Sequence, residues 1–130
     1  MRITRILADA KGVSHFAEHE VATDTVRLLR DMPPFRVTRF AGPSPVKFFA
    51  VPAELDIADW HTAPMRQLSI ALNGTVEYET GNGEVRRFTP GEVVLVEDTT
   101  GVGHITRFAP GEQRFLQIPV RDDWPGLPVS

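Results

Sequence analysis

The fold of this chain is decided by residues 66–96, RQLSIALNGTVEYETGNGEVRRFTPGEVVLV. Short runs of β-branched and apolar residues alternate there with glycine and proline turns, and this pattern predicts consecutive β-strands. The predicted strands are 66–72, 76–80, 84–88 and 93–96. Glycine accepts positive φ at little cost, so Gly81-Asn82-Gly83 predicts a tight hairpin turn.

Similar segments lie on both sides of this stretch. The additional predicted strands are 35–40, 46–51, 104–108 and 114–120. About eight short strands at ~8–12-residue spacing predict an antiparallel sandwich or barrel. One segment, Thr25–Asp31, has helical spacing and predicts one or two helical turns before Pro33 and Pro34 stop it.

The composition bounds the class of protein. The chain has 130 residues, 42% of them hydrophobic and 24% charged, which suits one globular domain. There is no cysteine, so disulfides, thiolate metal sites and cysteine nucleophiles are excluded. The net charge of −3 gives no basic surface for nucleic acid. With no membrane-spanning run or signal peptide visible, we expect a cytoplasmic protein that contacts neither membrane nor nucleic acid.

Two histidines stand at predicted strand ends among polar residues. His61 precedes the strand at 66–72, and His104 opens the strand at 104–108. Polar groups around two histidines at strand ends are typical of a small-molecule site. The other candidate residues are Trp60, Arg66, Gln67, Glu97, Asp98, Thr99 and the apolar Phe48. His15 and His19 have no third ligand nearby and are interpreted as ordinary strand residues.

The sequence leaves two questions about these candidate residues open. Arg66 opens an apolar strand and needs an anion, which is either a substrate or a carboxylate of Glu77, Glu97 or Asp98. Adjacent residues in a strand face opposite sides, so only one of Glu97 and Asp98 can point inward. Neither a glycine-flanked serine nor a phosphate-binding loop before a helix is present.

Two regions of the chain carry a resemblance to a known family. The first motif of the cupins is G-x5-H-x-H-x3,4-E-x6-G, and residues 61–74 are similar to it. His61 matches its first histidine and Gly74 its closing glycine, whereas Ala63 stands at the second histidine and Gln67 at the glutamate.

The second cupin motif is G-x5-P-x-G-x2-H-x3-N. Gly91 matches its opening glycine, and His104 matches its histidine after two extra residues. Glu97, Thr99 and Phe108 stand at the proline, glycine and asparagine positions. The chain therefore resembles a small single-domain cupin with altered metal motifs.

The resemblance implies one jelly-roll barrel domain over residues 1–130, with the motifs in about 46–120. It implies that residues 1–21 form strands that pair two copies into a homodimer, although such a strand can also fold back onto its own sheet. Residues 121–130 are expected to form a surface tail.

The family binds a divalent metal through three histidines and a glutamate. Because this chain keeps two of these histidines and has an amide at the carboxylate position, we expect no metal or other cofactor. The alternative is a divalent transition metal (iron, manganese or nickel) held by His61 and His104, with Glu97 or Asp98 as the third ligand.

The resulting functional hypothesis is a metal-independent lyase or isomerase that acts on a small carbonyl or carboxylate metabolite. His61 and His104 would be general acid and base, and Glu97 or Asp98 would hold one imidazole. Arg66 and Gln67 would bind the substrate oxygen, beside an apolar wall of Trp60 and Phe48. The alternatives are a metal-dependent dioxygenase or isomerase, and a non-catalytic module that binds or senses a ligand.

Overall fold

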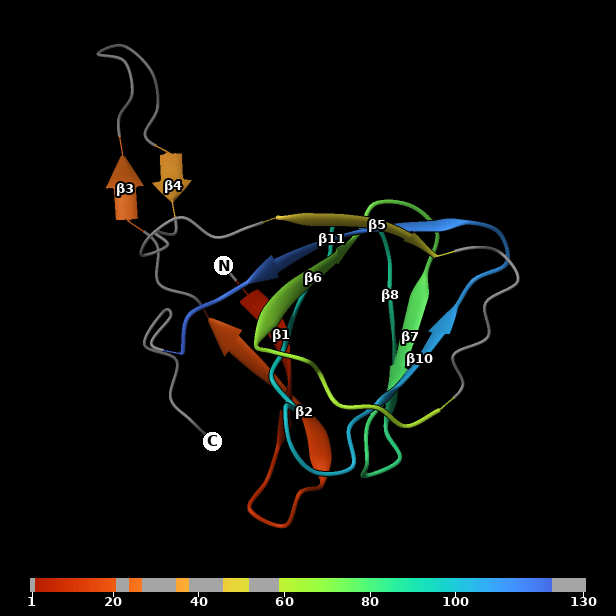
Figure 1. Cartoon of the computed structure of the whole chain (residues 1–130). Coiled ribbons are helices and arrows are strands. Elements are labelled where there is room, and N and C mark those ends of the chain that lie inside the picture. The colour runs from red at the N-terminus through yellow and green to blue at the C-terminus, as the bar shows by residue number, and fades with distance from the viewer. Residues whose placement is uncertain (1, 21–23, 27–34, 38–45, 52–58, 123–130) are drawn as a thin grey trace.

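The computed structural model describes residues 2–20, 24–26, 35–37, 46–51 and 59–122, which form eleven β-strands (Figure 1). The strands are β1 (Arg2–Ala8), β2 (Ser14–Glu20), β3 (Asp24–Val26), β4 (Phe35–Val37), β5 (Lys47–Val51), β6 (Gln67–Ala71), β7 (Val76–Glu79), β8 (Val85–Phe88), β9 (Val93–Val96), β10 (Ile105–Phe108) and β11 (Gln113–Pro119). These ranges contain no helix, so the described part of the chain is all-β, as the sequence predicts.

The strands form two principal sheets and a separate two-stranded ribbon. The larger sheet has the order β2-β1-β9-β6-β11-β5, the smaller one the order β10-β7-β8, and β3 pairs with β4. In Figure 1, β7, β8 and β10 stand opposite the larger sheet, and the β3–β4 ribbon lies apart from both. The eight predicted strands correspond to β4 to β11, because alternating residues and glycine turns define them locally. Residues 38–40 of the strand predicted at 35–40 lie outside the described residues.

One strand pair corrects the expectation of a wholly antiparallel fold. β1 runs parallel to β9, with Thr4 opposite Val94 and Ile6 opposite Val96. The Glu97 amide extends this ladder by donating to the Ile6 carbonyl at 2.7 Å. The two strands are far apart in sequence, so no tight turn dictates an antiparallel direction for them.

The N-terminal segment folds back onto its own sheet. β1 and β2 form an antiparallel hairpin in which Arg2 pairs with Glu20 and Ala8 with Ser14. This hairpin places β1 inside the larger sheet and β2 at its edge. The homodimer expected through this segment stays a prediction.

The helix predicted at 25–31 is wrong for its first two residues. Thr25 and Val26 lie in β3 and pair with Arg36 and Phe35 of β4. Threonine and valine are β-branched, and the pairing with β4 prevails over the helical spacing. Residues 27–31 lie outside the described residues.

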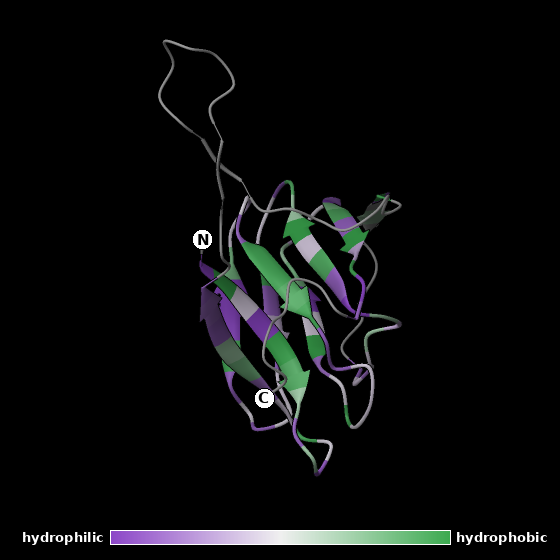
Figure 2. Ribbon diagram, turned by 90° about the vertical axis from the view of Figure 1, so that its left-hand side faces the viewer, coloured by the Kyte–Doolittle hydropathy of each residue, from purple (hydrophilic) through white to green (hydrophobic). Residues whose placement is uncertain are grey.

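Each face of the larger sheet carries an apolar cluster. Figure 2 shows apolar and polar residues alternating along several strands. The inner face packs against the smaller sheet in a core of Ile6, Phe16, Ala63, Ala71, Val76, Tyr78, Phe88, Val94, Val96 and Phe115. The outer face carries a second cluster of Ile3, Leu68 and Leu95, with Val93, Ile118 and Val120 packed against it.

Candidate functional site

The two histidines singled out from the sequence lie side by side. The His61 amide donates to the His104 carbonyl at 3.1 Å, and the His104 amide donates to the His61 carbonyl at 2.9 Å. This isolated antiparallel bridge extends the smaller sheet beyond β10. The ring centroids are 4.6 Å apart, with the ring planes tilted by 58°.

Gly103 permits this close approach. Its φ is +77°, a conformation that other residues rarely adopt. A Cβ at this position would also collide with the backbone of His61 and Thr62. The glycine is therefore required both by the turn before His104 and by the contact with the His61 segment.

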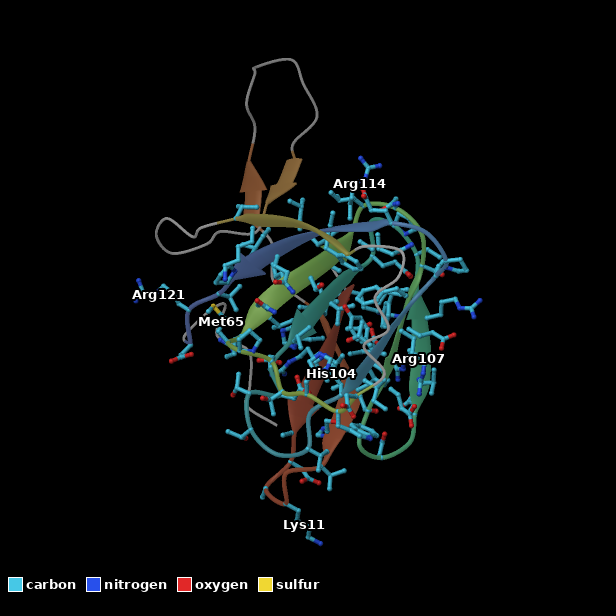
Figure 3. All side chains as sticks on the ribbon, turned by 45° about the vertical axis from the view of Figure 1, so that its right-hand side comes forward. Lys11, Met65, His104, Arg107, Arg114 and Arg121 are labelled. Atoms are coloured by element: carbon cyan, nitrogen blue, oxygen red, sulfur yellow. The ribbon has the colours of Figure 1, made fainter. Side chains whose placement is uncertain are left out.

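A buried carboxylate fixes the orientation of His104. Asp98 Oδ2 lies 2.7 Å from His104 Nδ1, and the two residues are 0% and 4% exposed. Because a carboxylate only accepts hydrogen bonds, Nδ1 carries the proton and Nε2 has the lone pair when the ring is neutral. Figure 3 shows His104 near the centre of the molecule, whereas Lys11 and Arg114 lie at its periphery.

His61 is held in the same way by a backbone oxygen. Its Nδ1 donates to the Asp59 carbonyl at 3.0 Å, which leaves Nε2 as the acceptor in the neutral ring. Unlike His104, His61 is exposed. The pair therefore consists of one buried imidazole and one exposed imidazole.

Tyr78 and Ser69 complete the buried surroundings of His104. The Tyr78 ring stands edge-on to His104 with centroids 5.6 Å apart, and its hydroxyl donates to Ser69 Oγ at 3.4 Å. Burial raises the pKa of Tyr78, the hydrogen bond to Ser69 opposes this, and the nearby Asp98 carboxylate adds to it. Tyr78 is therefore a neutral phenol at physiological pH.

Gln67 lies on the same inner face. It pairs with Val96, two residues before Asp98, and is only 4% exposed. Gln67 Oε1 and Asp98 Oδ1 are both buried without a hydrogen-bond partner among the described residues. Ala63, at the second-histidine position of the cupin motif, is buried here and donates its amide to the Asp98 carbonyl at 3.1 Å.

The structure separates Glu97 and Arg66 from the histidines. Glu97 points to the outer face, where its Oε2 lies 2.6 Å from Arg5 Nε and its Oε1 lies 2.8 Å from an Arg66 Nη. Arg66 also donates to the Arg121 carbonyl at 2.6 Å. Of the roles open to Arg66, the structure shows a carboxylate partner, on the face opposite to His104.

Two of the remaining candidates, Trp60 and Thr99, are exposed. Trp60 is 45% exposed, and Thr99 is exposed with its amide donating to the Glu97 carbonyl at 2.9 Å. Phe48 lies in β5, but its side chain is outside the described part of the structure. Tyr78, Ser69 and Arg5 were not predicted as site residues. Alternation within each strand indicates the direction of their side chains but not the partner that each one contacts.

The donor set does not fit the metal centre of the cupin family. Gln67, at the glutamate position of the motif, is neutral, and Glu97 is held on the other face by Arg5 and Arg66. Over the described ranges, no three His, Cys, Asp or Glu side chains are grouped so as to hold a metal ion. Two imidazoles and an amide are a weak ligand set for a hard divalent ion.

Chemically, the arrangement is a general base oriented by a carboxylate. A histidine whose Nδ1–H is held by an aspartate presents Nε2 for proton abstraction. Ser69 accepts from Tyr78, and no hydrogen bond joins it to either histidine, so the geometry favours proton transfer over nucleophilic attack by a serine.

No protein-family model matches the chain, and no curated protein matches it. A helix with the length and apolar character of a membrane span is not found in the described residues.

Proposed function

We propose that this chain is a small cupin-like jelly-roll barrel whose inner face binds a small carbonyl compound. Two sheets enclosing one apolar core support the barrel. The pairing of His61 with His104 supports the cupin resemblance, because the two motifs come from separate parts of the sequence and meet at these residues.

The proposed activity is metal-independent proton transfer, as in a lyase or an isomerase. The observation that carries it is the buried 2.7 Å contact between Asp98 Oδ2 and His104 Nδ1. His104 Nε2 removes a proton from the carbon next to the carbonyl, and Asp98 stabilises the imidazolium that forms. The apolar core around the site strengthens this electrostatic stabilisation.

His61 and Gln67 have supporting roles in this proposal. His61 is exposed and lies against the His104 ring, so it carries a proton from solvent to the substrate, while His104 loses the proton that it abstracted. The Gln67 amide nitrogen donates a hydrogen bond to the carbonyl oxygen, where negative charge develops when the proton leaves.

The experiment that tests this function is deuterium exchange. The protein is incubated in D2O with a panel of small ketones and hydroxy ketones, and loss of the protons next to the carbonyl is followed by NMR. We expect His104→Gln to slow the exchange by roughly 10²- to 10⁴-fold, the usual contribution of a positioned base. His61→Gln should have a smaller effect, because solvent can replace an exposed proton donor.

His19→Gln is the matched control, since His19 lies in the edge strand β2 opposite Ile3 and belongs to neither motif. Exchange in His104→Gln at the rate of the unaltered protein would contradict the proposal. Saturable binding with no exchange in any variant would instead indicate the non-catalytic ligand-binding module.

A further inference from the structure

The inner face around His104 presents hydrogen-bond acceptors that lack donors. Asp98 Oδ1 and Gln67 Oε1 are buried, on residues 0% and 4% exposed, and neither has a partner among the described residues. Buried polar atoms are nearly always paired, and an unpaired one in a native structure requires an explanation. A bound ligand that donates hydrogen bonds to these two oxygens would explain why the protein leaves them unpaired.

The two imidazoles add further acceptors. The Nδ1–H groups of His61 and His104 are used by the Asp59 carbonyl and the Asp98 carboxylate. The Nε2 atoms of the neutral rings are therefore acceptors as well, and no hydrogen bond to either atom occurs within the described structure. The site thus offers acceptor lone pairs on Asp98, Gln67 and the two neutral histidines, together with the Gln67 amide nitrogen as a donor.

Among the described residues, the arginines that are not fully exposed are paired away from this site. Arg5 and Arg66 hold Glu97 on the outer face. Arg86 lies over the Phe16 ring and is paired with Glu18 and Glu84, each at 2.8 Å. Within the described residues, no hydrogen bond or ion pair joins an arginine or lysine to Asp98, Gln67 or either histidine.

We infer that the ligand of this site is an uncharged carbonyl compound bearing a hydroxyl group beside the carbonyl, and not a carboxylate. The hydroxyl donates to Asp98 Oδ1 or Gln67 Oε1, while the Gln67 amide nitrogen binds the carbonyl. A carboxylate would be desolvated beside Asp98, and the described residues pair no arginine or lysine with this site to compensate it, which is strongly unfavourable. This inference rests on the proposed function and narrows its substrate class.

Three probes with the same acetyl group test the inference. Hydroxyacetone carries the hydroxyl, acetone lacks it, and pyruvate replaces it with a carboxylate. Binding is measured by NMR titration of the histidine ring resonances at constant ionic strength. We expect hydroxyacetone to bind about tenfold more tightly than acetone, as one hydrogen bond to a charged or buried acceptor allows, and pyruvate to bind most weakly.

Two buried glutamines provide a matched pair of variants. Gln113 also has a buried Oε1 without a partner in the described residues, but it packs beside Gly74, beyond the other end of β6 from Gln67. Gln67→Leu should bring the affinities for hydroxyacetone and acetone to within about twofold of each other by removing the hydrogen bond. Gln113→Leu should leave the preference as in the unaltered protein.

The outcomes separate this inference from the proposed function. Tighter binding of pyruvate than of hydroxyacetone, equal binding of hydroxyacetone and acetone, or no binding of any probe would overturn the inference. Rapid exchange of pyruvate protons would overturn it while supporting proton transfer. Preferential binding of hydroxyacetone with no exchange would support it and contradict the catalytic proposal. If Gln67→Leu does not fold, the relative affinities of the three probes for the unaltered protein still test the inferred ligand class.

Discussion

Glu97 and Asp98 are neighbours in the sequence with the same functional group, yet the sheet assigns them to opposite faces. Glu97 accepts from Arg5 and Arg66 on the outer face. Asp98 is fully buried on the inner face, where one oxygen accepts from His104 and the other has no partner among the described residues. Glu97 is thus satisfied within the protein, whereas Asp98 retains capacity for a ligand.

The partner of each carboxylate, more than its charge or burial, determines whether the carboxylate stabilises the fold or serves reactivity. Both carboxylates are largely inaccessible to solvent. One is held by two guanidinium groups, and removing it would leave buried cations. The other orients an imidazole whose Nε2 has a lone pair in the neutral ring. We therefore expect the first to control stability and the second to control reactivity.

The largest expected effect is on proton transfer in Asp98→Asn. The amide can donate to Nδ1 and so favours the tautomer that has a proton on Nε2, where the base must be free. We expect the exchange rate to fall by roughly 10²- to 10⁴-fold with the fold retained, as measured by deuterium exchange and circular dichroism. Glu97→Gln, the neighbouring control, should keep its exchange rate per folded molecule; an equal loss in both variants would remove the contrast between the faces.

The next effect is on stability in Glu97→Gln. Removing the charge leaves Arg5 and Arg66 beside a neutral group, and the loss of one partner of a buried ion pair costs about 3 kcal/mol or more. Urea unfolding measures this loss. Glu79→Gln is the control, since its pair with Arg107 is more exposed, with side chains 24% and 42% accessible, and should cost less than about 1 kcal/mol. Equal costs would show that the outer-face cluster is not a buried ion pair in solution.

Gly103→Ala tests the contact between the two histidine segments. The new Cβ combines an unfavourable positive φ with a collision against the His61 backbone. Gly83→Ala is the control, because Gly83 has φ +85° but open space around it. We expect Gly103→Ala to lower the free energy of unfolding by about 2 kcal/mol more than Gly83→Ala. It should also slow deuterium exchange, and an exchange rate unaffected by it would mean that proton transfer does not require the bridge.

The smallest expected effect concerns Tyr78, the only tyrosine of the chain. Tyr78→Phe should cost about 1 kcal/mol at neutral pH through its hydrogen bond to Ser69. Because burial raises the pKa of Tyr78 above its usual 10.0, the phenolate forms more readily in the unfolded chain. The stability due to this shift is complete below pH 10 and is lost as the pH rises towards the folded pKa.

Phenolate absorbance against pH, with and without denaturant, measures that shift directly. Tyr78→Phe should remove the corresponding alkaline loss of stability. If the phenol titrates at the same pH in both states, Tyr78 is not buried against His104 and Asp98.

The parts of the fold that local chemistry controls were predictable. The strands of residues 66–96 follow from alternation and glycine turns, and all of them occur. The rule that adjacent strand residues face opposite sides also anticipated that only one of Glu97 and Asp98 would face inward. It could not say which, because the direction depends on how β9 packs between β1 and β6.

The features that were predicted wrongly or not at all depend on contacts between residues that are distant in the sequence. Thr25 and Val26 have helical spacing but pair with β4, and β1 joins β9 in parallel. Arg5 stands in a short apolar strand with nothing nearby in sequence to mark its partner Glu97. Tyr78 likewise shows its direction by alternation, while its contact with His104 is made across β7 and β10.

By itself, the sequence determined an all-β chain with two histidines at strand ends, because strand periodicity and turn residues are local properties. Only the tertiary structure decided that Asp98 holds His104, that Glu97 holds two arginines, and that Tyr78 and Gln67 face the same interior. Each of these pairings depends on the register between strands distant in sequence, since a shift of one residue would turn every side chain to the other face.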